Sequence, residues 1–329
     1  MLRVEGLQVH FPIRKGLLLD RQVGAVRAVD GVDLAVPPGT TLGLVGESGC
    51  GKSTVGKAIV RLVPITAGTV HQGDCELSAL EGAELRHARR HVQMIFQDPY
   101  SSLNPRQSVG RIIGEPIRTH SLREGAGVDA RVREMLDAVG LPASAASRYP
   151  HEFSGGQRQR IGIARALAAE PTLIIADEPV SALDVSIQAQ VINLLEALQA
   201  DLGLTYLLIS HDLAVVRHIS DTVAVMYLGV IVETAPADVL YGDPLHPYTL
   251  ALLSAVPVPD PVVEDTRKRI VLQGDLPSAA NPPSGCRFRT RCPFAQQRCA
   301  DEVPELTEIS AGHKVACHFV DEVRSQRAS

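Results

Sequence analysis

Nine residues that begin at Gly46 constrain the fold of this chain more than any other feature. They fit the pattern G-x-x-x-x-G-K-[ST], since they read Gly46-Glu47-Ser48-Gly49-Cys50-Gly51-Lys52-Ser53-Thr54. The apolar run at 42–45 is typical of a buried strand, and the apolar residues at 58–62 favour a helix. A strand, a glycine-rich turn and a helix N-terminus form the context in which this pattern binds phosphate.

The residue types in this loop fit the chemistry of a nucleoside triphosphate. The glycines free backbone N–H groups to wrap the β-phosphate, and the dipole of the following helix favours an anion. Lys52 supplies a positive charge between the β- and γ-phosphates, and Ser53 supplies a hydroxyl for Mg²⁺. The alternative is a glycine-rich loop that matches by chance, which the strand and helix context disfavours. The loop therefore predicts nucleoside triphosphate binding.

Composition narrows the class of protein. The chain has 329 residues, 45% of them hydrophobic and 21% charged, as in a soluble globular protein with one large and one smaller domain. Its net charge of −5 disfavours a general nucleic-acid binder, whose affinity rests on neutralising phosphates. No apolar run reaches the roughly 18 residues of a membrane span. The first residues do not have the pattern of a signal peptide, so we expect a cytoplasmic chain.

Short apolar runs followed by polar residues indicate where a site forms. The runs that predict strands of a mostly parallel, buried sheet are 42–45, 92–96, 173–176 and 204–209. The polar residues at or just after their ends are Glu47, Gln97, Asp177 and His211. Ligands of open α/β sheets bind beyond the carboxyl ends of the strands, so these side chains are expected at one site. The run at 223–232 predicts a strand pair that closes the sheet.

A second glycine-rich segment narrows the class further, because a phosphate loop alone also fits kinases, GTPases and helicases. It reads Phe153-Ser154-Gly155-Gly156-Gln157 and precedes an amphipathic helical pattern. Ser154 and the bare amides behind it would form a second anion site, suited to a γ-phosphate. The segment resembles the LSGGQ signature of ATP-binding-cassette (ABC) ATPases, with Phe153 in place of the usual leucine.

Further motifs of the ABC family follow in the family's order, and the resemblance covers about residues 1–240. They are Gln97, the signature, the pair Asp177-Glu178, the segment Ser181-Ala182-Leu183-Asp184, and His211. The resemblance implies an α/β fold of the P-loop NTPase class: a RecA-like, mostly parallel sheet core with an antiparallel β edge and a helical subdomain at about 98–157. Residues 241–329, rich in proline, are expected to form a small loop-rich C-terminal domain that carries a cysteine cluster.

The resemblance also implies an ATPase in which two such domains close head to tail around two ATP molecules. Asp177 is expected near Mg²⁺ with Ser53 and Gln97, Glu178 to polarise the attacking water, and His211 to contact the γ-phosphate. The alternatives are an acidic pair that caps a helix and a structural histidine. The implied ATP-binding set is the loop 46–54 with Ser154, Gly155, Gly156, Gln157 and Asp184.

One departure from the family concerns the nucleotide base. ABC ATPases usually stack adenine on an aromatic residue ahead of the phosphate loop, and the stretch 20–26, where it is expected, has none. The substitute is expected at Val26, at Arg21 or in the region of Phe11.

Three phrases resemble the ATPases of oligopeptide and dipeptide importers, at 28–32, 97–105 and 244–249. This implies peptide import at the cytoplasmic face of the membrane, as a peripheral subunit. The implied partners are a sister ATPase (a heterodimer), two permeases, one of which contacts the Gln97 region, and indirectly an extracytoplasmic peptide-binding protein, with no nucleic acid. Nickel, glutathione or opine importers are alternatives within the family. A soluble ABC ATPase acting on nucleic acid or ribosomes is disfavoured, because only 55 residues separate Gln97 from the signature.

Four of the six cysteines lie near the C-terminal end, at Cys286, Cys292, Cys299 and Cys317. In a reducing compartment such a cluster indicates metal ligation before disulfides. Four thiolates suit a [4Fe–4S] cluster or a zinc site, and the absence of a C-x₂-C pair favours iron–sulfur over zinc; free thiols are the third possibility. The arginines beside them are expected either to offset thiolate charge or to form a solvated basic face; they are Arg287, Arg289, Arg291 and Arg298.

Overall fold

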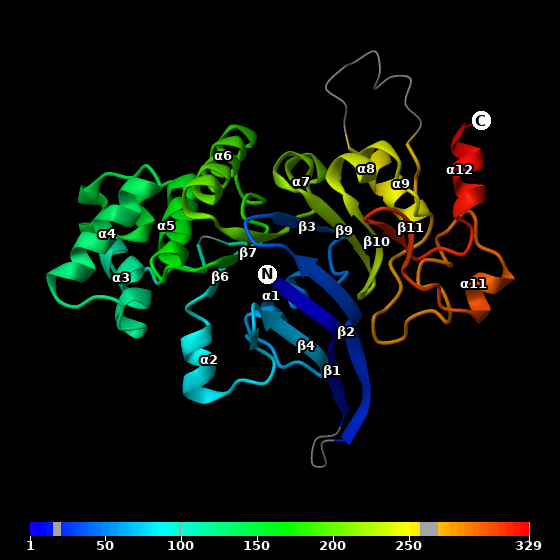
Figure 1. Cartoon of the computed structure of the whole chain (residues 1–329), viewed down its shortest axis with the longest axis horizontal. Helices are drawn as coiled ribbons and strands as arrows, with labels where there is room; N and C mark the ends of the chain where they lie inside the picture. Colours follow the sequence, from blue (N-terminus) through cyan, green and yellow to red (C-terminus); the bar gives the residue numbers. More distant parts are fainter. Residues whose placement is uncertain (16–20, 99, 257–268, 329) are drawn as a thin grey trace.

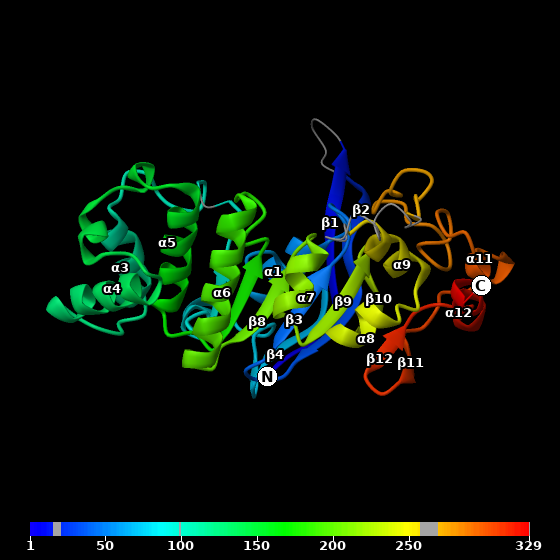
Figure 2. The same cartoon turned by 90° about the horizontal axis from the view of Figure 1, so that it is seen from above.

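The computed structural model describes residues 1–329 apart from 16–20, 99, 257–268 and 329. Figure 1 and Figure 2 show three regions along its long axis: a group of helices at one end, two sheets in the middle, and the C-terminal residues at the other end. Among the described residues, no helix is both long and apolar enough to cross a membrane.

The larger sheet has eight strands and forms the centre of the molecule. Its strands are, in spatial order, β11 (Thr307–Ser310), β12 (His313–Val315), β10 (Val230–Pro236), β9 (Thr222–Tyr227), β3 (Thr41–Val45), β8 (Thr205–Ile209), β7 (Leu173–Asp177) and β6 (Val92–Ile95). From β9 to β6 all neighbours are parallel, whereas β10 returns antiparallel to β9. The four strands and the strand pair predicted from apolar runs are confirmed.

Both faces of the parallel strands are covered, which explains why their sequences are continuously apolar instead of alternating. In β8, Leu207 and Ile209 pack in one cluster with α1 (Lys52–Ile59) and the smaller sheet. Tyr206 and Leu208 point to the other face, into a cluster with α5 (Gly155–Leu167) and α6 (Val185–Leu202). The parallel strands therefore lie between two buried cores, one on each face of the sheet.

The smaller sheet is antiparallel and packs over α1. Its strands, in spatial order, are β2 (Arg21–Val36), β1 (Leu2–Lys15), β4 (Ala67–Gln72) and β5 (Cys75–Glu76), and α2 (Gly82–Ala88) follows in the chain. β1 and β2 form a long hairpin whose register runs from Leu2 opposite Val36 to Lys15 opposite Arg21. This sheet is the antiparallel β edge that the family resemblance implies.

The helical end of the molecule consists of the segment predicted as an insert. It contains α3 (Val109–Thr119), α4 (Ala126–Ala138), two short 3₁₀ turns (Ala143–Ser147 and Pro150–Glu152) and the start of α5. Ile112 and Ile113 of α3 and Leu136 of α4 are buried in one core with α5. Figure 1 shows α3, α4 and α5 on the side of the sheets opposite the C-terminus.

Part of the chain after residue 240 adds two strands, β11 and β12, to one edge of the larger sheet. The remaining helices are α7 (Leu213–Ile219), α8 (Ala237–Gly242), α9 (Pro247–Ser254), α11 (Gln297–Asp301) and α12 (Val320–Ala328). β12 pairs antiparallel with β10, with Val315 opposite Glu233. The ring of Tyr227 on β9 lies 4.7 Å from that of Tyr248 on α9 and 5.2 Å from that of Phe288, centroid to centroid. This buried aromatic cluster joins the C-terminal residues to the larger sheet.

Candidate active site

The phosphate loop connects β3 to α1, as its sequence predicts. Gly46 and Gly51 have φ angles of 153° and 112°, in the range that favours glycine. A Cβ at Gly51 would lie 2.1 Å from the carbonyl oxygen of Ala28, and one at Gly46 would lie 2.2 Å from that of Met226. The loop is wedged between β2 and β9, which leaves no room for a side chain at either position.

Lys52 is the first residue of α1, and it is only 4% exposed. Its Nζ donates to the carbonyl oxygens of Gly46, at 2.6 Å, and Glu47, at 3.0 Å. The loop therefore holds the ammonium group at its own centre. There, phosphate oxygens can compete with these two carbonyl oxygens for the N–H donors of Lys52.

Ser53 and Asp177 meet beside the phosphate loop although they are 124 positions apart. Ser53 Oγ donates to Asp177 Oδ1 at 2.7 Å. Asp177 ends β7, and burial raises the pKa of its carboxyl, against the opposing effect of the Ser53 hydrogen bond. A hydroxyl and a carboxylate are oxygen ligands of the kind that Mg²⁺ prefers, so this pair can hold the ion.

Glu178 lies between two other side chains that the sequence predicts at the site. Its Oε2 accepts a hydrogen bond from Gln97 Nε2 at 2.7 Å, and its Oε1 lies 3.1 Å from His211 Nδ1. Its φ of 47° is left-handed, which is uncommon for a residue other than glycine. The Glu178 N–H donates to the carbonyl of Ile209 at 2.8 Å and holds this conformation. The carboxylate is thus fixed in place from two sides.

A cavity of about 200 Å³ joins the phosphate loop to Glu178. Its lining residues are Ala28, Ser48, Gly49, Gly51, Lys52, Ser53, Thr54, Gln97 and Glu178. Among the described residues that line it there is none from the signature, and neither Asp184 nor His211 takes part. One chain therefore brings the loop, Gln97 and Glu178 together but leaves its own signature outside.

The signature leads into α5, and its polar residues Ser154 and Gln157 are exposed, whereas Phe153 is buried. Ser154 and Gln157 cap the helix reciprocally: Ser154 Oγ accepts from Gln157 N at 3.3 Å, and Gln157 Oε1 accepts from Ser154 N at 3.0 Å. A Cβ at Gly156 would lie 2.4 Å from Ile187 Cγ2, so glycine lets α6 approach. Ser154 and Asp184 are both exposed, which leaves them available to a second chain.

The candidates for the base contact lie on the β1–β2 hairpin. Phe11 is directly opposite Val26 in the register and is 37% exposed. Val26 is two residues before Ala28, whose carbonyl abuts the phosphate loop, whereas Arg21 pairs with Lys15 further along the hairpin. The hairpin therefore brings two of the three predicted candidates, Phe11 and Val26, side by side. A base contact at Val26, at Arg21 or in the region of Phe11 stays a prediction.

The four C-terminal cysteines are neighbours, and all are free thiols. Burial above all, with the nearby thiols adding to it, raises the pKa of Cys292 to about 12 and that of Cys317 to about 11. The sulfurs of Cys286, Cys292 and Cys317 each accept a hydrogen bond from the backbone N–H two residues ahead. In the part of the chain that the structure describes, however, no three His, Cys, Asp or Glu side chains are grouped closely enough to hold a metal ion.

Most of the arginines near these cysteines in the sequence contact groups other than the thiols. Three of them pair with carboxylates: Arg287 with Asp30, Arg291 with Glu47 and Arg298 with Glu302. Burial raises the pKa of Cys286, and the charge of Arg289 opposes this rise only in part. The sequence leaves open whether these arginines offset thiolate charge or form a solvated basic face; in the structure, carboxylates bind three of the four guanidinium groups.

Two contacts of the phosphate loop escape sequence reasoning. Glu47 binds the side chains of Arg291 and Tyr248, which lie beyond residue 240. The phrase at 244–249 is visible in the sequence, but nothing in it connects Tyr248 to a loop 201 positions away.

Comparison with known proteins places these motifs in context. Residues 29–181 match the family model described as "ABC transporter", and residues 232–299 match "Oligopeptide/dipeptide transporter, C-terminal region". The chain is 56% identical to the oligopeptide transport ATP-binding protein AppF of Bacillus subtilis, over 97% of each chain. It is 55% identical to OppF of Escherichia coli, over 98% of this chain and 96% of that protein.

A solved structure shares the fold. The ATP-binding cassette MJ0796, described as a dimer in a post-hydrolysis state bound to ADP and Pi, superposes with a TM-score of 0.63 at 27% identity. The match covers 72% of this chain and 99% of that one.

Proposed function

Because this chain belongs to the ABC transporter family of ATP-binding proteins, in its oligopeptide/dipeptide branch, we propose that it hydrolyses ATP to power import of di- or oligopeptides through a membrane transporter. One observation carries the peptide assignment. The likeness to oligopeptide transport ATP-binding proteins runs through the whole chain, including the C-terminal region typical of that branch. The chain acts as a peripheral subunit at the cytoplasmic face of the membrane, bound to two permeases and indirectly to an extracytoplasmic peptide-binding protein.

The residues of the site divide the reaction among them. The loop amides and Lys52 bind the β- and γ-phosphates of the substrate. Ser53, Asp177 and Gln97 would hold Mg²⁺, which would offset phosphate charge when bound. Glu178 accepts a proton from the water whose oxygen attacks the γ-phosphorus, and the bond to the bridging oxygen breaks to release ADP and phosphate. His211 keeps the Glu178 carboxylate in place from the side opposite Gln97.

A second ATPase subunit completes each site in this proposal. The support is that Ser154 and Asp184 are exposed and lie outside the cavity of their own chain. The signature of a partner would face this phosphate loop, where its bare amides meet the γ-phosphate. The partner is a sister ATPase, so that the working pair is a heterodimer that closes on ATP binding and opens after hydrolysis.

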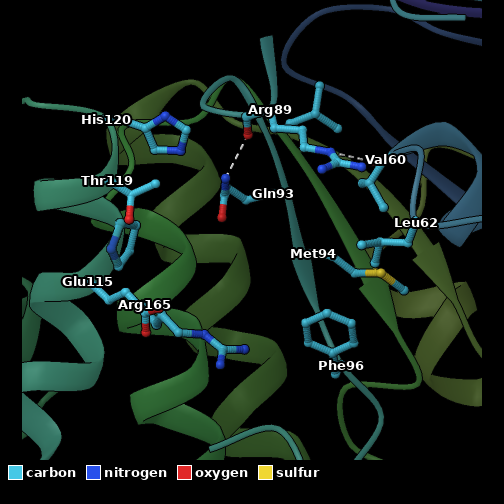
Figure 3. Close-up of a pocket in the computed structure, with 12 residues that line it drawn as sticks. Val60, Leu62, Arg89, Gln93, Met94, Phe96, Glu115, Thr119, His120 and Arg165 are labelled. Carbon is cyan, nitrogen blue, oxygen red and sulfur yellow. Dashed lines mark hydrogen bonds between the residues drawn. The ribbon is translucent and has the colours of Figure 1, made fainter. Parts of the chain in front are cut away.

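The permease contact is proposed at a groove of about 340 Å³ between the central sheet and the helical end. Figure 3 shows Val60, Leu62, Met94 and Phe96 on one side of it and Thr119 with Glu115 on the other. Arg89 and Arg165 add positive charge to its lining. An apolar helix with a polar flank fits this lining. Because Phe96 directly precedes Gln97, such a helix would press on the end of β6 that leads to Gln97, whose side chain donates to Glu178.

Leu62→Arg should therefore uncouple the chain from its permeases. Leu62 is 52% exposed, so the substitution places a charge on the apolar side of the groove without disturbing a core. We expect the variant to keep the ATPase activity of the isolated chain and to co-purify with two permeases from detergent extracts at least about 10-fold less well, as hot-spot contacts do when lost. Leu202→Arg is the matched control, since Leu202 is 54% exposed at the far end of α6.

The proteins or nucleic acids that co-purify with the chain test both the groove assignment and the importer proposal. Normal recovery of the permeases with Leu62→Arg would contradict the groove assignment. Recovery of nucleic acid or ribosomes instead of permeases would contradict the importer proposal itself.

We also propose that Cys286, Cys292, Cys299 and Cys317 ligate a metal centre, an iron–sulfur cluster in preference to zinc. The support is their mutual proximity and the N–H groups aimed at three of the sulfurs, a pattern that stabilises thiolates. Because the described side chains do not form a group that could hold a metal ion, ligation requires the four thiols to move closer to one another.

Protein purified without oxygen should contain about four irons and four acid-labile sulfides per chain, with absorbance near roughly 400 nm. Cys292→Ser should lose most of this content, because one ligand is removed. Cys75→Ser, at an exposed cysteine outside the cluster, should keep it. Stoichiometric zinc would indicate a structural zinc site instead of an iron–sulfur cluster, and metal-free protein would indicate free thiols.

A further inference from the structure

Glu47, the second residue of the phosphate loop, is held through three different groups. Its carbonyl oxygen accepts from Lys52 Nζ at 3.0 Å. Its N–H donates to the hydroxyl oxygen of Tyr248 at 2.7 Å. Its carboxylate accepts two hydrogen bonds from the guanidinium of Arg291, at 2.7 and 3.1 Å. Two of these three partners belong to the chain beyond residue 240.

The Arg291 contact has the geometry of a strong interaction. Both terminal nitrogens bind separate carboxylate oxygens, which is the bidentate arrangement that fixes orientation as well as charge. The Arg291 side chain is 9% exposed and that of Glu47 is 29% exposed, so water screens the pair only in part.

The rest of the C-terminal region supports this contact. Tyr248 is fully buried, and its ring packs against Tyr227 and Phe288. Arg287, four residues before Arg291, donates to the carbonyl of Leu228 and pairs with Asp30, so it ties the same segment to the two sheets through contacts outside the phosphate loop. Arg291 therefore approaches the loop from a docked segment.

We propose that Arg291 is a positioning residue for the phosphate loop, through which the cysteine-bearing C-terminal region sets the affinity of the site for ATP. Through Glu47 it fixes the loop at the point where Lys52 is held. This inference rests on the assignment of loop 46–54 as the ATP site. It adds a residue 244 positions away to that site.

The test compares the KM and kcat for ATP, and the affinity for a trinitrophenyl-ATP probe, in substituted full-length chains. Arg291→Gln should raise KM and the probe's Kd about 10-fold, the scale of a lost charge-assisted contact, and leave kcat within about 2-fold. Arg291→Lys should give an intermediate KM, since it keeps the charge but not the fork. In a Glu47→Gln background, Arg291→Gln should add little, because the two residues act as one pair.

Arg287→Gln is the matched control, because it loosens the same segment from the sheet. It should lower the melting temperature as much as Arg291→Gln does but leave KM near the wild-type value. An equal rise of KM in both variants, or no rise in either, would overturn the positioning role and leave only a structural one. Lys52→Ala tests the premise that loop 46–54 is the ATP site. If that variant binds the probe normally, the ATP site itself is misassigned.

Discussion

Glu178→Gln is expected to bind ATP with near wild-type affinity and to hydrolyse it about 10²–10⁴-fold more slowly, the usual contribution of a positioned base. The amide keeps the size of the side chain and can still contact Gln97 and His211. It cannot take the proton of the attacking water. Single-turnover hydrolysis with purified chain, measured beside equilibrium binding of ATP, checks both parts of the expectation.

The matched control for this variant is Glu196→Gln. Glu196 lies on α6, is 36% exposed and pairs with His218, away from the phosphate loop. The same loss of charge there should leave hydrolysis unchanged. Wild-type turnover by Glu178→Gln would remove Glu178 from its role as base, and a loss of ATP binding would show that its main effect is on the shape of the site.

Lys52→Ala should strongly weaken nucleotide binding. The substitution removes the charge that the loop holds at its centre and leaves the carbonyls of Gly46 and Glu47 without their donor. We expect the Kd for ATP to rise by about 10- to 100-fold, the range for a lost hydrogen bond to a charged group. Isothermal titration of ATP with Mg²⁺ measures this directly.

Lys314→Ala controls for the loss of a lysine, because Lys314 is exposed on β12. It should bind ATP as the wild-type chain does. If Lys52→Ala bound ATP normally, the phosphates would have to bind away from loop 46–54.

The parallel core was predictable because its strands are buried on both faces. β3, β6, β7 and β8 read as unbroken apolar runs, and the motifs at their ends fix which edge carries the site. β11 and β12 were not predictable, because all four residues of β11 are exposed and both strands are short. The β1–β2 hairpin was only implied by resemblance, and bulges interrupt its alternation.

Within the site, the sequence predicts the residues that a local motif identifies. Gln97, Glu178 and His211 end different segments of one sheet, and the structure brings them together. The pairing of Arg291 with Glu47 could not be predicted, because an arginine in a loop-rich region has no pattern that names its partner. The place of the signature could not be derived from one chain either, since its proposed partner is the phosphate loop of another.

Peptide uptake by the reconstituted transporter tests the proposed function. Vesicles that contain the two permeases, this chain, its sister ATPase and the binding protein should accumulate a labelled oligopeptide when ATP is supplied on the side of the ATPases. Glu178→Gln in this chain should strongly reduce that uptake while ATP still binds. ATP hydrolysis without peptide uptake, or uptake that Glu178→Gln leaves unchanged, would contradict the proposal that this chain powers peptide import.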